Sequence, residues 1–104
     1  MMNFNYQELM KQAQAAQRQM EKIQEELKST NYEASSGGGA VKVKVNGDQE
    51  VLEVNIDKGA FEPADIEMLQ DMVLVALNDA IRQSKEDAKA KLMGVTGGMS
   101  IPGF

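Results

Sequence analysis

The side chains that could do chemistry in this chain are amines, guanidinium groups and carboxylates, because it contains neither cysteine nor histidine. These absences remove the commonest general base, the usual zinc ligands and every Ser/His/Asp or Cys/His arrangement. The carboxylates lack the loop spacing of a calcium-binding motif. We therefore expect no catalytic site, no metal site and no cofactor, and a role in binding rather than in an enzymatic reaction.

Basic residues near both ends of the chain form two stripes with helical spacing. The candidate DNA-binding residues are Lys11, Arg18, Lys22, Arg82, Lys85 and Lys89. The first three stand at i, i+7 and i+11 and the last three at i, i+3 and i+7, so each set can meet phosphates from one helix face. The alternative is a solvated face whose cations pair with neighbouring acids. For Lys42 and Lys44, on a strand, we expect pairing with Glu33 or Glu53.

The formal net charge of −5 is unevenly distributed. Residues 46–79 carry nine acidic groups against one base, Lys58, whereas residues 1–24 and 80–104 have a small positive balance. Long-range repulsion by the whole chain opposes a polyanionic partner, but the basic ends weaken that objection. The acidic middle leaves a second function open, an interaction module whose helices grip another protein.

Two long helices must position these stripes. Over residues 5–29, apolar or small residues recur at alternating steps of three and four among strong helix formers, without glycine or proline, which predicts a helix. A second helix is predicted to begin near Pro63, which suits a first turn, and to run to about Leu92. Its middle, residues 68–77, is apolar on more than one face, so we expect it to be buried from two sides.

Three short segments between the helices predict an antiparallel meander, and hence an α+β fold of order α-β-β-β-α. Residues 41–45 alternate valine with lysine, which is typical of a half-buried strand. Asn46 and Gly47 form a strong hairpin signal. In the strand predicted after this turn, residues 51–56, Leu52 alternates with polar residues in step with Val54 and Ile56, so we expect these three to share one side. A less regular strand precedes the three glycines at residues 37–39.

We expect one domain over residues 1–93 and a flexible, glycine-rich tail over residues 94–104. Helices of this length are about 37 and 42 Å long, whereas a compact domain of this size has a diameter of roughly 34 Å, so the helices must overhang. A second chain is the simplest cover for an overhanging apolar stripe; the alternative is that the first helix folds back on the second. The predicted dimer interface comprises Leu9, Ala13, Met20, Ile23, Leu27, Met72 and Val75.

Seven segments, in order and spacing, resemble the YbaB/EbfC family of bacterial nucleoid-associated proteins over nearly the whole chain. They are LMKQAQ at residues 9–14, MEKIQEE at 20–26, GGAVKVKVNG at 38–47, VNID at 54–57, DIEMLQD at 65–71, LNDA at 77–80 and GGMSIPG at 97–103. The resemblance implies a tweezers-like homodimer whose sheets join at the centre and whose helical ends bind DNA.

The resemblance also implies roles in nucleoid organisation and gene regulation, and a cytoplasmic location in association with the nucleoid. The apolar runs are all far shorter than the ~20 residues that span a bilayer, so we expect no membrane partner. The sequence offers no cluster of asparagine and arginine for reading base edges. We therefore expect a homodimer that binds double-stranded DNA with little sequence preference and takes no small-molecule substrate.

Overall fold

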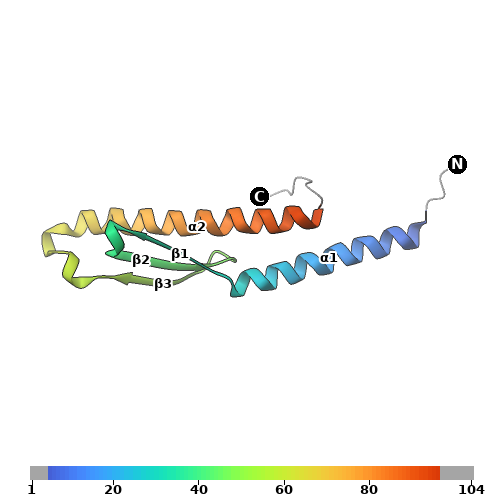
Figure 1. The fold of residues 1–104 in the computed structure, drawn as a ribbon, viewed down its shortest axis with the longest axis horizontal. Coiled ribbons are helices and arrows are strands. Elements are labelled where there is room, and N and C mark those ends of the chain that lie inside the picture. Colours follow the sequence, from blue (N-terminus) through green and yellow to red (C-terminus); the bar gives the residue numbers. More distant parts are fainter. Residues whose placement is uncertain (1–4, 97–104) are drawn as a thin grey trace.

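The computed structural model describes residues 5–96 and has the predicted α+β order (Figure 1). Its helices and strands are α1 (Tyr6–Ser29), β1 (Asn31–Ser36), β2 (Val41–Asn46), β3 (Val51–Ile56) and α2 (Ile66–Thr96). The three strands form one antiparallel sheet in the order β1-β2-β3, so the predicted meander is confirmed. Short 3₁₀ turns connect β1 to β2 and β3 to α2.

The helix ends follow from local hydrogen bonding. Asn5 caps α1, its side-chain oxygen accepting from the backbone N–H of Glu8 at 3.2 Å. Before α2, Glu62 and Asp65 form a reciprocal capping box around a 3₁₀ turn that contains Pro63. This turn occupies the predicted start of the second helix, so α2 itself begins only at Ile66.

The C-terminal end of α2 differs from the prediction. The helix continues to Thr96, past the expected end at Leu92. Gly94 is therefore helical and not the first residue of a tail, because one exposed glycine costs a long helix only about 1 kcal/mol. The rest of the predicted tail, residues 97–104, lies outside the described residues.

The β2–β3 pairing contains a bulge that the alternation in the sequence did not predict. Lys44 pairs with Glu53, but the next residue of β2, Val45, pairs with Val51. Leu52 is thus the extra residue, so the register of β3 against β2 shifts by one residue at this point. A bulge of this kind moves one side chain out of register and increases the local twist.

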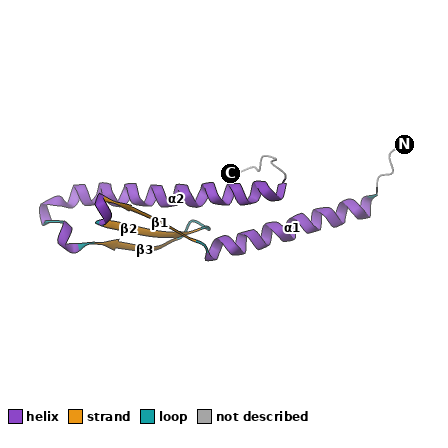
Figure 2. Ribbon diagram, viewed as in Figure 1, coloured by secondary structure: helices purple, strands orange, loops and turns teal. Residues whose placement is uncertain are grey.

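The core lies between α2 and only part of the sheet. Val41, Val43 and Val45 of β2 are buried against Ala76 and Ala80 of α2. The small alanine side chains let the helix approach the sheet closely, and α2 packs along β1 and β2 (Figure 2). Every residue of β3 is exposed, so the sheet extends beyond the cover that its own chain provides.

The hairpin after β2 holds the base of α1. The Gly47 N–H donates to the carbonyl oxygens of Leu27, at 2.7 Å, and Thr30, at 3.1 Å. Leu27 is the buried residue of α1, and beyond it the helix runs past the end of α2 (Figure 1). The molecule measures 75 × 21 × 16 Å, which confirms the expected overhang; α1 contacts α2 near this base rather than folding back along its whole length.

Candidate nucleic-acid interface

The predicted basic residues lie on α1 and on the C-terminal half of α2. All six are exposed, three on α1 and three on the C-terminal half of α2: Lys11, Arg18, Lys22, Arg82, Lys85 and Lys89. α1 and the C-terminal part of α2 project from the same end of the sheet and form the helical arms of the molecule (Figure 1). Acidic residues Glu62, Asp65 and Glu67 lie at the opposite end, around the turn that leads into α2. The acidic residues of this turn therefore lie far from the candidate cations of α1 along the long axis.

The α1 stripe faces away from the rest of the chain. At 3.6 residues per turn, Lys11, Arg18 and Lys22 lie roughly opposite the helix face that carries Leu27. Leu27 is buried near the hairpin and α2. The three cations therefore point outward from the arm, where a phosphate backbone could approach without steric interference from the same chain.

The α2 stripe is a separate surface in which one cation is already paired. Arg82 forms an ion pair with Asp79 at 2.8 Å. Within residues 5–96, no ion pair engages Lys85 or Lys89. These lysines lie away from the buried helix face, so within one chain the α1 and α2 stripes do not converge on a single site.

The lysines of β2 are placed on the outer face of the sheet, as predicted. The Lys44 amine lies 3.6 Å from a carboxylate oxygen of Glu33 and 3.5 Å from one of Glu53. The expected cross-strand pairing is therefore confirmed for Lys44. These three residues and the exposed Lys42 line a shallow hollow of about 360 Å³, in which two carboxylates offset the positive charge.

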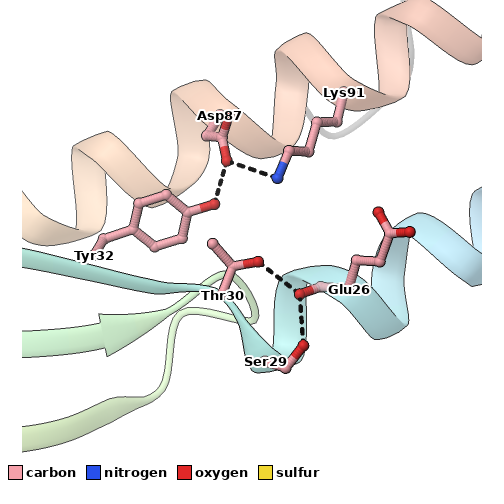
Figure 3. A network of polar contacts seen from close by, with 6 residues as sticks. All are labelled: Glu26, Ser29, Thr30, Tyr32, Asp87 and Lys91. Carbon is pink, nitrogen blue, oxygen red and sulfur yellow. Dashed lines mark hydrogen bonds and ion pairs between the residues drawn. The ribbon is translucent and has the colours of Figure 1, made fainter.

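A polar network at the base of the arms was not predicted. The Tyr32 hydroxyl of β1 donates to the Asp87 carboxylate of α2, and that carboxylate lies 3.1 Å from the Lys91 amine (Figure 3). At the junction between α1 and β1, the Thr30 hydroxyl donates to the Glu26 carbonyl oxygen at 2.7 Å. Tyr32 and Asp87 are 55 positions apart, so no local pattern in the sequence signals their contact.

The network shifts the pKa of both partners. Burial, followed by the hydrogen bond and the negative charge of Asp87, raises the pKa of Tyr32 to about 12. The hydrogen bond from Tyr32 and the nearby Lys91 lower the pKa of the Asp87 carboxyl. Asp87 is thus held ionised between a donor and a cation, and it compensates the charge of Lys91 beside the α2 stripe.

The predicted dimer-interface residues differ in how far their own chain covers them. Leu27 is buried beside the hairpin. Met72, against the core, and Met20 and Ile23, on α1, are half-buried. The exposed residues are Leu9 and Ala13 on α1 and Val75 on α2, the last at 51% exposure.

Metal-binding clusters and membrane-spanning helices are both absent from residues 5–96. Among residues 5–96, no three acidic side chains gather closely enough to hold a metal ion. Neither helix, over the same residues, is long and apolar enough to cross a bilayer.

The chain is similar to known proteins over nearly its whole length. It is 47% identical to a nucleoid-associated protein of Clostridium novyi over 99% of this chain and 89% of the relative. It is 49% identical to one of Syntrophobacter fumaroxidans over 91% and 86% of the two chains. The crystal structure of the uncharacterized protein HP0035 from Helicobacter pylori matches with a TM-score of 0.81 and 26% identity, over 91% of this chain and 100% of that one. Residues 1–99 match the YbaB/EbfC DNA-binding family, and the chain belongs to that family.

Proposed function

We propose that this protein is a nucleoid-associated protein whose homodimer binds double-stranded DNA through the basic faces of its helical arms, with little sequence preference. The family and the names of its relatives support DNA binding at the nucleoid. The observation that carries the assignment to the arms is the exposure of all six predicted cations on α1 and the C-terminal half of α2, away from the acidic turn. Effects on nucleoid organisation and gene expression follow from such binding.

Binding of this kind works through phosphates. Each lysine or arginine that neutralises a phosphate releases condensed counterions, which supplies a favourable free energy independent of sequence. Phosphate contacts position a protein on the duplex, whereas sequence is read from base edges. The outward stripe of Lys11, Arg18 and Lys22 suits the first task, and for the second it offers a single guanidinium group, that of Arg18.

Charge reversal on α1 tests the assignment. Lys11→Glu should weaken binding to unrelated duplexes alike, by about fivefold or more at low salt, because it removes a phosphate contact and adds repulsion. Lys58→Glu is the matched control, since Lys58 is an exposed lysine near the acidic turn. Fluorescence anisotropy with labelled duplexes measures both. Equal effects of the two variants would exclude α1 from the site, and no binding by the natural chain at low salt would favour the protein-binding alternative.

The proposed dimer surface lies at the sheet end of the molecule. β3 is an edge strand whose second edge has no neighbour within residues 5–96, and Val54, paired with the buried Val43, is itself 43% exposed. On α2, Leu74 and Val75 are also exposed. Soluble proteins rarely leave an apolar edge strand open, because it invites pairing with another chain. A second copy covering this surface would bury these residues and duplicate the basic arms.

Replacing one residue of β3 tests the dimer. Val54→Asp should convert the dimer to a monomer, because a carboxylate would have to be buried without a partner. Asn55→Asp adds the same charge to the adjacent residue, which faces the other side of the sheet and pairs with Lys42, and should remain dimeric. Light scattering gives the mass and circular dichroism checks the fold. A monomeric natural chain, or a dimeric Val54→Asp, would contradict the proposal.

A further inference from the structure

The apolar face of α1 is covered at its base and open toward its N-terminal end. Leu27 is buried and lines one hollow with Leu92 of α2. Met20 and Ile23, farther along the same face, are half-buried, whereas every residue from 6 to 15 is exposed. The cover that α2 gives to α1 therefore stops near the middle of the helix.

The open part continues the covered face. Leu9 and Leu27 are 18 residues apart, which is five turns at 3.6 residues per turn, so they lie on one line along α1. Tyr6 and Ala13 belong to the same stripe. Leu9 is 46% and Tyr6 65% exposed. Most helix stability in proteins comes from packing of the apolar face, and within residues 5–96 this half of α1 lacks such packing.

The C-terminal end of α2 is directed toward this open part. The two helices run in opposite directions, and α2 ends beside the middle of α1 (Figure 1). Leu27 lines a hollow with Ala88 and Leu92, so at about 1.5 Å per residue Thr96 lies level with roughly residue 21 of α1. On the same scale, Ala13 lies about 12 Å, Leu9 about 18 Å and Tyr6 about 22 Å beyond the end of α2.

The chain that follows Thr96 matches this surface in length and chemistry. Residues 97–104, GGMSIPGF, contain no charged side chain and three large apolar ones, those of Met99, Ile101 and Phe104. Eight extended residues span about 26 Å at ~3.3 Å each. Met99 can therefore reach about 10 Å, Ile101 about 16 Å and Phe104 about 26 Å past Thr96, close to the levels of the three open residues of α1.

We propose that residues 97–104 dock on the open apolar stripe of α1 in the same chain, with Ile101 against Leu9. Gly97 and Gly98 follow α2 directly and allow the chain to turn onto α1, since glycine accepts backbone conformations that other residues avoid. The occupant is the chain's own segment because α2 delivers it to the correct face at a high effective concentration.

Docking would leave the candidate DNA-binding face free. Lys11 and Arg18 lie on the opposite side of α1 from Leu9, and an uncharged segment adds no repulsion near them. The docked segment would order the half of the arm that carries Lys11, so that less conformational freedom is lost when a phosphate binds. This last step rests on the DNA-binding function proposed above, whereas docking itself does not.

Disulfide equilibria test the register, because the natural chain has no cysteine of its own. A chain with Leu9→Cys and Ile101→Cys should close an intrachain disulfide in a glutathione buffer. The matched control combines Gln7→Cys with Ile101→Cys, since Gln7 is two residues away on the opposite side of the helix. Docking favours the Leu9 pair by tenfold or more in effective concentration. Non-reducing electrophoresis with peptide mass spectrometry separates intrachain from interchain links.

Hydrogen exchange tests the cover of α1 without a cysteine. Ile101→Asp should speed amide exchange over residues 6–16 by about tenfold or more, because loss of one buried apolar side chain shifts a local opening equilibrium by such a factor. Ser100→Asp adds the same charge to the adjacent residue, whose side chain points to the other side of an extended segment, and should exchange like the natural chain. A chain that ends at Thr96 should match Ile101→Asp, and residues 66–76 of α2 should be unchanged in all variants.

The outcomes separate docking from the proposed function, since neither measurement uses DNA. Equal closure of the Leu9 and Gln7 pairs, or equal exchange of residues 6–16 in the natural and shortened chains, would overturn docking. Predominant interchain links would assign the stripe to a segment of another copy and also overturn it. If docking is observed and the natural chain binds no DNA at low salt, docking stands and the DNA-binding proposal fails.

Discussion

At the scale of single residues, the contact between Tyr32 and Asp87 ties the start of the sheet to α2. Tyr32→Phe removes a half-buried hydrogen bond to a carboxylate and should lower the free energy of unfolding by about 1 kcal/mol at pH 7. Urea unfolding followed by circular dichroism measures it, with Tyr6→Phe, an exposed tyrosine on the open arm, as the control. Equal unfolding midpoints for Tyr32→Phe and the natural chain would show that the contact contributes nothing.

The raised pKa of Tyr32 adds a pH dependence to this difference. A group whose pKa rises on folding stabilises the protein fully below its unfolded pKa and loses that contribution as the pH rises to its folded pKa. The window here runs from pH 10, the ordinary pKa of a tyrosine, to about 12, the pKa of Tyr32 in the folded chain. The difference between the natural chain and Tyr32→Phe should therefore shrink across this range. A difference that stays constant from pH 9 to 12 would contradict the shift.

At the scale of elements, the hairpin after β2 sets where α1 begins its overhang. A Cβ at Gly47 would lie 2.5 Å from the Leu27 carbonyl oxygen and 2.6 Å from the Leu27 Cβ, so Gly47→Ala must displace the arm. We expect a loss of about 2 kcal/mol in the free energy of unfolding. Gly94→Ala has the opposite sign, a gain of up to about 1 kcal/mol, because Gly94 is exposed in α2 with open space around its Cα. A thermal melt of both variants checks the pair, and a tolerated Gly47→Ala would mean that the hairpin does not hold the arm.

At the scale of the whole molecule, a net charge of −5 makes DNA binding depend on the local field of the arms. If the dimer engages about four phosphates, the slope of log affinity against log salt should be about −3.6, and loss of the Lys11 contact from both protomers should reduce its magnitude by about 1.8. Anisotropy titrations at several salt concentrations measure the slope for the natural chain and for Lys11→Ala. A slope near zero would show that phosphate contacts do not supply the affinity.

The sequence by itself determined the elements of this protein and their order. Periodicity of three and four identifies α1, strict alternation identifies β2, and the Asn46-Gly47 signal locates the hairpin. These patterns involve only a few neighbouring residues, so they can be recognised from the sequence without knowledge of the tertiary structure. The positions of the basic stripes follow from the same helical spacing. Gly47 was predicted as a turn residue, yet in the structure it is Gln49 that has a positive φ, and glycine at position 47 is required by the close approach of Leu27.

Only the tertiary structure decided which apolar residues are covered and which polar groups meet. The valines of β2 and the residues of β3 have similar patterns, but α2 covers the first and leaves the second exposed. The same holds for α1, where Leu27 is buried and Leu9 is open. Contacts between distant positions, such as Tyr32 with Asp87, depend on how α2 lies across the sheet. Burial is a property of packing between elements, and no local pattern contains it.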